Sequence, residues 1–165
     1  YGYQGDLIIV GNTGSAQHKQ ALDNAVQELG LSQRVRFDGE VPHQRISSYF
    51  KHADVFVFPS IEETFGIPLL EAMAFGVPIV ASDGDLDAQY RGKCFTPFRE
   101  ICGDAAQYFN PFDVEGMAKG MHHILTDEPY RRECIAKGRE RVRHYDLGTT
   151  ARSLMQLFDT VVSPP

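Results

Sequence analysis

Short apolar runs alternate along the whole chain with segments whose apolar residues recur at helical spacing. The apolar runs predict strands at 6–10, 34–39, 55–58, 79–81 and 107–111. The helically spaced segments predict helices at 18–29, 43–52, 68–75, 114–125, 129–145 and 147–162. Such strand–helix alternation predicts an α/β fold, a Rossmann-like doubly wound parallel sheet flanked by helices, in one domain over residues 1–165.

The predicted helix at 68–75 carries local signals at both ends. Pro68 suits the first helical position, where a missing N–H is no loss. Gly76 followed by Pro78 is the matching stop signal. The next run, Ile79 to Ala81, has no polar alternation, as expected of a parallel strand covered on both faces.

Two carboxylates, Glu63 and Glu71, flank the start of this helix. Between them, Phe65, Gly66 and Ile67 offer backbone N–H groups, and Gly66 has no Cβ to keep a ligand away. Free N–H groups and the positive end of the helix dipole attract an anion, whereas carboxylates accept hydrogen bonds from hydroxyl groups. Together they suggest a ligand with phosphates and hydroxyls, such as a nucleotide-sugar. Glutamate is also common in the first turn of ordinary helices, so these residues alone leave a plain βαβ unit open.

The full string is more specific. Glu63-x7-Glu71 encloses Phe65-Gly66 and is followed by Ala72-Met73-Ala74-x-Gly76-x-Pro78. This string closely resembles the donor-binding motif of the family-four retaining glycosyltransferases of the GT-B class, also called glycosyltransferase group 1. The resemblance implies that residues 1–165 form the carboxyl-terminal half of a GT-B fold, the nucleotide-sugar (donor) binding domain. It also implies that the amino-terminal acceptor domain is absent from this chain, so we expect no turnover from the chain alone.

The same resemblance implies an activity and roles for individual residues. The implied activity is transfer of a sugar, for which mannose is a candidate, from a nucleoside-diphosphate sugar to a hydroxyl acceptor. The configuration at the anomeric carbon would be retained, and no metal or other cofactor would be needed. Glu63 would be the catalytic residue that orients the donor sugar, and Glu71 would hold the ribose hydroxyls. Phe65, Gly66, Ile67 and Leu70 would bind the donor diphosphate at the helix start. A glycan or lipid-linked acceptor would bind the absent domain.

The resemblance implies two further donor-binding residues, each in a loop after an earlier predicted strand. Gly11 opens the loop after the first predicted strand, and the resemblance places this loop at the edge of the donor cleft. Gly11 and Gly14 lack the G-x-G-x-x-G spacing, which disfavours a nicotinamide cofactor, and an ordinary strand-to-helix turn remains the alternative. Val41 follows the second strand, where the resembled family reads the nucleotide base through backbone atoms. An ordinary loop is the alternative there.

Composition excludes several other functions. A net charge of −6 and a pI near 5.5 argue against a nucleic-acid partner. No apolar run approaches the roughly 18 residues that span a bilayer, and no signal peptide is visible. Three cysteines without a Cys-x-x-Cys pair indicate reduced thiols and a cytoplasmic protein. The adjacent His122 and His123 do not form a metal-binding array, so no metal site is expected.

Two segments leave their role open. The helix at 129–145 carries a basic run from Arg131 to Arg143, which is usually a solvated face but could dock peripherally on an anionic membrane surface. Residues 83–97 form a polar loop that the resembled family lacks at this length, and a tolerated surface loop or a role in ligand choice are both compatible with it.

Two other functions stay open. The domain could hold a nucleotide-sugar without transferring the sugar, or it could belong to a nucleotide-sugar epimerase with the same donor cleft. Binding of nucleoside diphosphates without hydride chemistry and without Mg²⁺ would favour the donor-domain interpretation over an oxidoreductase.

Overall fold

The computed structural model describes residues 2–83 and 94–162 of the chain. The chain divides into two compact units, Tyr1–Tyr49 and Phe50–Pro165, which are treated one at a time below.

The first unit contains a parallel pair of strands and a covering helix. β1 (Leu7–Val10) and β2 (Val35–Gly39) pair with Leu7 opposite Val35. Between them lies α1 (Ala16–Glu28), which begins where the hydroxyl of Ser15 accepts a hydrogen bond from the N–H of His18. The next helix, α2 (His43–His52), runs across the boundary into the second unit.

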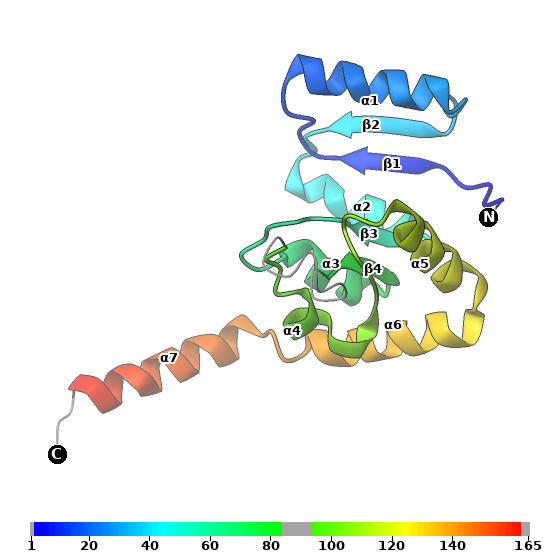
Figure 1. Ribbon diagram of the computed structural model, residues 1–165. Helices are drawn as coiled ribbons and strands as arrows, with labels where there is room; N and C mark the ends of the chain where they lie inside the picture. The colour runs from blue at the N-terminus through cyan, green and yellow to red at the C-terminus, as the bar shows by residue number, and fades with distance from the viewer. Residues whose placement is uncertain (1, 84–93, 163–165) are drawn as a thin grey trace. The chain divides into compact units, whose positions relative to one another are not determined.

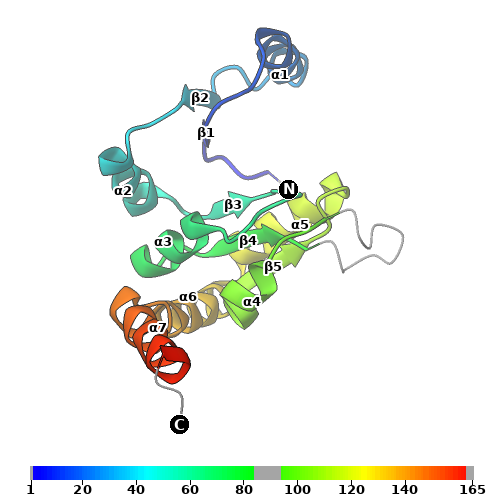
Figure 2. The same ribbon diagram turned by 90° about the vertical axis from the view of Figure 1, so that its left-hand side faces the viewer.

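The second unit is built on a three-stranded parallel sheet in the order β3-β4-β5 (Figures 1 and 2). Its strands are β3 (Phe56–Phe58), β4 (Ile79–Ser82) and β5 (Ala106–Phe109). Residues of β4 are buried throughout because the strand is central and covered on both faces. The pairing places Phe58 beside Ala81, and Ser82 beside Phe109.

Helices surround this sheet (Figure 1). They are α3 (Ile67–Phe75), α4 (Phe98–Cys102) with the 3₁₀ turn η3 (Gly103–Ala105), α5 (Val114–Thr126) and α6 (Glu128–Val142). The last helix, α7 (Leu147–Val162), follows α6 in the chain and has no buried residue. α5 packs on β4 and β5, and α3 packs on both β4 and α6. A glycine lets α6 approach α3 closely, because a Cβ at Gly138 would lie 3.0 Å from Cγ of Met73.

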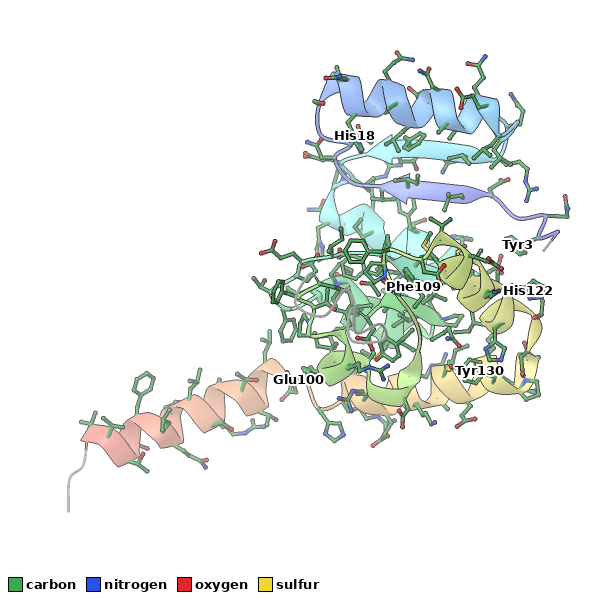
Figure 3. The ribbon with its side chains drawn as sticks, viewed as in Figure 1. Tyr3, His18, Glu100, Phe109, His122 and Tyr130 are labelled. Atoms are coloured by element: carbon green, nitrogen blue, oxygen red, sulfur yellow. The ribbon has the colours of Figure 1, made fainter. Side chains whose placement is uncertain are left out.

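The core has an aliphatic and an aromatic part. Val80, Phe109, Ile124 and Cys134 form a buried cluster, and Tyr130 of α6 packs against it (Figure 3). In the aromatic part, phenylalanine rings contact one another in a series that runs from α3 through α2 and β3 to α4. Their centroids lie 5.1–5.8 Å apart for the pairs Phe75–Phe50, Phe50–Phe56, Phe56–Phe58 and Phe58–Phe98.

The predicted α/β fold with parallel strands and flanking helices is confirmed. The predicted helices at 43–52 and 147–162 have the observed bounds. Asp113 caps α5 by accepting a hydrogen bond from the N–H of Gly116. The strands pair in two sheets, one in each unit, instead of one.

Three local assignments were wrong or incomplete. Residues 98–105 form α4 and a 3₁₀ turn that were not predicted. α6 ends at Val142 and not near Tyr145, and β5 ends at Phe109. Most of the predicted insertion at 83–97 lies outside the described residues, which resume at Cys94.

The basic run of α6 is largely paired with acidic side chains on the same helix. The ion pairs are Arg131 and Arg132 with Glu128, Lys137 with Glu133, and Arg143 with Glu140. The run is therefore a mixed-charge surface of the kind common on solvated helices. Across residues 2–83 and 94–162, no helix combines the length and the apolar character that crossing a membrane requires.

Candidate functional site

The amino end of α3 has no side-chain cap. Gly66 lies just before the helix with φ +96° and provides no side-chain cap. Its carbonyl accepts a hydrogen bond from the N–H of Leu69 at 2.9 Å, and Pro68 has no N–H. Within the described part of the chain, no protein group accepts a hydrogen bond from the N–H of Gly66 or Ile67. Two N–H groups without a protein acceptor therefore lie at the positive end of the helix dipole, one on the buried Gly66 and one on the exposed Ile67.

Gly66 is required by the protein itself. A Cβ on this residue would lie 2.9 Å from Cε1 of Phe98 and 3.1 Å from Cδ1 of Leu69, both fully buried side chains. The positive φ also favours glycine. We predicted from the sequence that the missing Cβ makes room for a ligand. The structure corrects this explanation, because protein side chains fill the space that a Cβ would occupy.

The segment that leads into α3 is fixed by main-chain bonds to Phe95. The N–H of Phe95 donates to the carbonyl of Ile61 at 2.8 Å, and the N–H of Glu63 donates to the carbonyl of Phe95 at 2.9 Å. This short parallel bridge holds Glu63 next to the helix start. The Glu63 side chain is half-buried and lies within 3.3 Å of the hydroxyl of Ser60.

Phe65 packs against Tyr145, which follows α6 in the chain. Its ring meets the ring of Tyr145 edge-on, with centroids 5.9 Å apart. The hydroxyl of Tyr145 donates to the carbonyl of Glu100 at 3.1 Å. The guanidinium of Arg141, on α6, donates to the same carbonyl and to that of Ile101. Arg141 and Tyr145 thus cap the carboxyl end of α4. Phe65 nevertheless remains 42% exposed and available to a ligand.

An ion pair that sequence reasoning missed lies at the carboxyl end of β4. Asp83 is only 6% exposed and pairs with the guanidinium of Arg99 in α4. The same guanidinium lies over the ring of Tyr108, 4.4 Å from its centroid. Tyr108 donates to the carbonyl of Gly103 at 2.7 Å, and its burial raises its pKa well above the ordinary value. These contacts fix the position of α4, and therefore also the position of the Phe98 ring that packs against Gly66.

The other predicted residues occupy the expected elements. Glu71 is half-buried on α3, one turn after the helix start, and Leu70 precedes it. Gly11 and Val41 belong to the first unit, where they lie in the loops that follow β1 and β2. These two loops are joined by the hydrogen bond from Asn12 to Glu40 at 3.2 Å, and by the N–H of Gly11 to the carbonyl of Gly39 at 2.8 Å.

Metal-binding side chains do not cluster in the described part of the chain. Among the described residues, no three His, Cys, Asp or Glu side chains are grouped so that they could hold an ion. The three cysteines, Cys94, Cys102 and Cys134, are free thiols.

Comparison with known proteins identifies relatives over nearly the entire chain. The model of the family described as glycosyl transferases group 1 matches residues 3–141. A phosphatidyl-myo-inositol mannosyltransferase of Mycolicibacterium smegmatis is 37% identical over 159 residues, covering 94% of this chain and 37% of the relative. The chain thus spans less than two fifths of that relative's length.

Solved structures share the fold. A sucrose-phosphate synthase from Thermosynechococcus elongatus matches with a TM-score of 0.78 and 28% identity, over 96% of this chain and 39% of that one. HepE from Anabaena, in complex with UDP and glucose, matches with a TM-score of 0.79 and 20% identity, over 94% of this chain and 40% of that one. With a family model covering most of its length and a relative above one third identity, the chain belongs to the glycosyl transferases group 1 family.

Proposed function

We propose that this chain is the donor-binding part of a retaining glycosyltransferase that uses a nucleoside-diphosphate sugar. The observation that carries the proposal is the uncapped start of α3, where the N–H groups of Gly66 and Ile67 have no acceptor among the described residues. Glu63 lies just before the helix, and Glu71 lies one turn into it. A diphosphate meets these donors, because an anion is stabilised at a helix amino end.

The two carboxylates have separate tasks. Glu71 accepts hydrogen bonds from the ribose hydroxyls of the nucleotide. Glu63 accepts hydrogen bonds from hydroxyls of the donor sugar and orients it for transfer, which contributes through positioning. Phe65 and Leu70 complete the donor contacts around the helix start, and the N–H donors stabilise the departing diphosphate without a metal ion.

Mannose is the sugar we propose. The relatives include the Mycolicibacterium smegmatis enzyme and an O-antigen chain mannosyltransferase B of Escherichia coli, which is 32% identical over 67% of this chain. GDP-mannose is therefore the first donor to test. The acceptor, a glycan or a lipid-linked sugar, binds the part of the whole protein that lies outside this chain. The base-reading role of Val41 and the cleft-edge role of Gly11 stay predictions.

Calorimetric titration of the chain tests the proposal. GDP, UDP and ADP, and then GDP-mannose, UDP-glucose and ADP-glucose, are titrated in the presence of EDTA. Glu71→Ala should weaken binding of the preferred nucleoside diphosphate roughly tenfold or more, as expected for loss of hydrogen bonds to a charged group. Glu63→Ala should retain that affinity and lose the preference for the sugar-bearing ligand.

Glu62→Ala is the matched control, because Glu62 is the exposed neighbour of Glu63. This variant should bind all ligands with the affinity of the parent chain. The site assignment is overturned when Glu63→Ala and Glu71→Ala both bind like the parent. Binding without sugar transfer by the full-length protein would favour a binding module, and conversion of the nucleotide-sugar into its epimer would favour an epimerase.

A further inference from the structure

Two serine hydroxyls connect the ends of neighbouring strands to the segment that carries Glu63. Ser82 is the last residue of β4 and is fully buried. Its hydroxyl donates a hydrogen bond to the main-chain carbonyl of Ser60, two residues after β3 ends at Phe58. The chain is thereby fixed at Ser60, immediately before it turns towards α3.

The side chain of Ser60 points back to the candidate catalytic residue. Its hydroxyl donates to Oε1 of Glu63 at 3.3 Å, and Ser60 is half-buried. The main chain of Glu63 is already held by Phe95, through the bond from the Glu63 N–H at 2.9 Å. What remains to be set is the rotamer of the Glu63 side chain, and the Ser60 hydroxyl contacts it directly.

We propose that Ser60 is a positioning residue for Glu63. It holds one carboxylate oxygen so that the other, Oε2, is directed to a hydroxyl of the donor sugar. A carboxylate offers about four acceptor positions on its two oxygens, so one bond from Ser60 leaves the group able to bind a ligand. Restricting the rotamer in advance reduces the ordering that sugar binding would otherwise require. This inference rests on the proposed function, since it assigns Ser60 a role only through Glu63.

The positioning role predicts an effect on the sugar and none on the nucleotide. In calorimetric titrations of the chain, the ratio of the Kd for the nucleoside diphosphate to the Kd for its sugar-bearing form is compared between variants, using whichever of the GDP–mannose, UDP–glucose or ADP–glucose pairs binds best. Ser60→Ala should lower this ratio roughly three- to tenfold, in line with one hydrogen bond to a charged group. The Kd of the nucleoside diphosphate itself should not change.

Two further variants separate positioning from a structural effect. Ser60→Thr keeps the hydroxyl and should restore most of the ratio. Thr126→Ala removes a hydroxyl that bonds to the carbonyl of His122 on α5, and it should leave the ratio unchanged. A merely structural role of Ser60 would weaken both ligands equally, and that result overturns the inference.

A double-mutant cycle with Glu63→Ala decides whether Ser60 acts through Glu63. Ser60→Ala should have no further effect on the ratio in the Glu63→Ala background, whereas two independent effects would add. Additive effects overturn the inference. If Glu63→Ala alone leaves the ratio unchanged, or if none of the three pairs binds, the proposed function fails and the inference fails with it. If Glu63→Ala lowers the ratio and Ser60→Ala does not, only the inference fails.

Discussion

The ring of Phe98 lies directly against Gly66, so that a β-carbon on this glycine would stand 2.9 Å from Cε1 of Phe98. Phe98 is fully buried and stacks on Phe58, with centroids 5.1 Å apart, so it cannot move aside. The backbone at the start of α3 is therefore set by packing against Phe98.

Gly66→Ala should destabilise the second unit strongly. The left-handed backbone costs about 1–2 kcal/mol for alanine, and overpacking against Phe98 adds about 1–3 kcal/mol. Gly76→Ala at the other end of α3 is the matched control. It has a similar φ of +70°, but its new Cβ meets the end of the flexible Arg139 side chain, so it should cost less. Urea denaturation measures both variants, and equal losses would contradict a special role for Phe98.

Arg99→Ala should cost about 1–2 kcal/mol of unfolding free energy. Asp83 is only 6% exposed and loses its charged partner in this variant, while the 55% exposure of the Arg99 side chain keeps the loss below that of a fully buried pair. Arg143→Ala removes an exposed pair with Glu140 and should change the free energy by less than about 0.5 kcal/mol. Urea denaturation measures the free energy of unfolding of both variants. If Arg99→Ala lowers it no more than Arg143→Ala does, the buried carboxylate of Asp83 does not depend on Arg99.

Asp38 should make the first unit sensitive to acid. Hydrogen bonds from Arg36 at 2.6 Å and from the hydroxyl of Tyr49 at 2.6 Å hold the pKa of Asp38 below its ordinary value. The folded pKa lies below the unfolded value of about 3.9. The stability that ionised Asp38 contributes is therefore complete above about pH 3.9 and is lost as the pH falls through the folded pKa. Tyr49→Phe should raise the Asp38 pKa towards its ordinary value, as followed by NMR titration of the carboxyl carbon. An unchanged pKa would show that Tyr49 does not contribute.

The three thiols should differ sharply in reactivity. Burial raises the pKa of Cys102 to about 12 and also raises that of Cys134, and both side chains are at most 1% exposed. Cys94 is half-exposed. Iodoacetamide at pH 8 should therefore label Cys94 alone in the folded chain, and all three cysteines in urea, as counted by mass spectrometry. Rapid labelling of Cys102 under native conditions would mean that α4 opens readily.

Sequence reasoning succeeded where the signals are local. Pro68 and Gly76 mark the ends of α3 within one residue of the observed bounds, because each acts on the backbone at its own position. The glutamates and the exposed helix start could also be placed on the chain, because the spacing from Glu63 to Glu71 is read directly from the sequence.

The parts that were missed depend on distant residues. α4 has only five residues and its end is capped by Arg141, forty positions later in the chain than Ile101, so no local pattern indicates it. The pair Asp83–Arg99 joins residues from β4 and α4 that only the tertiary fold brings together. The same holds for Phe98, whose contact explains Gly66 better than any local argument does.

The nine-residue helix α3 ends in left-handed glycines on both sides, and this fixes how its length can vary. Inserting or deleting one residue between Gly66 and Glu71 would turn Glu71 by about 100° about the helix axis relative to Gly66. It would also move Met73 away from its close contact with Gly138. Natural variation at this point should therefore take the form of substitutions, while length changes accumulate in the loops elsewhere in the chain.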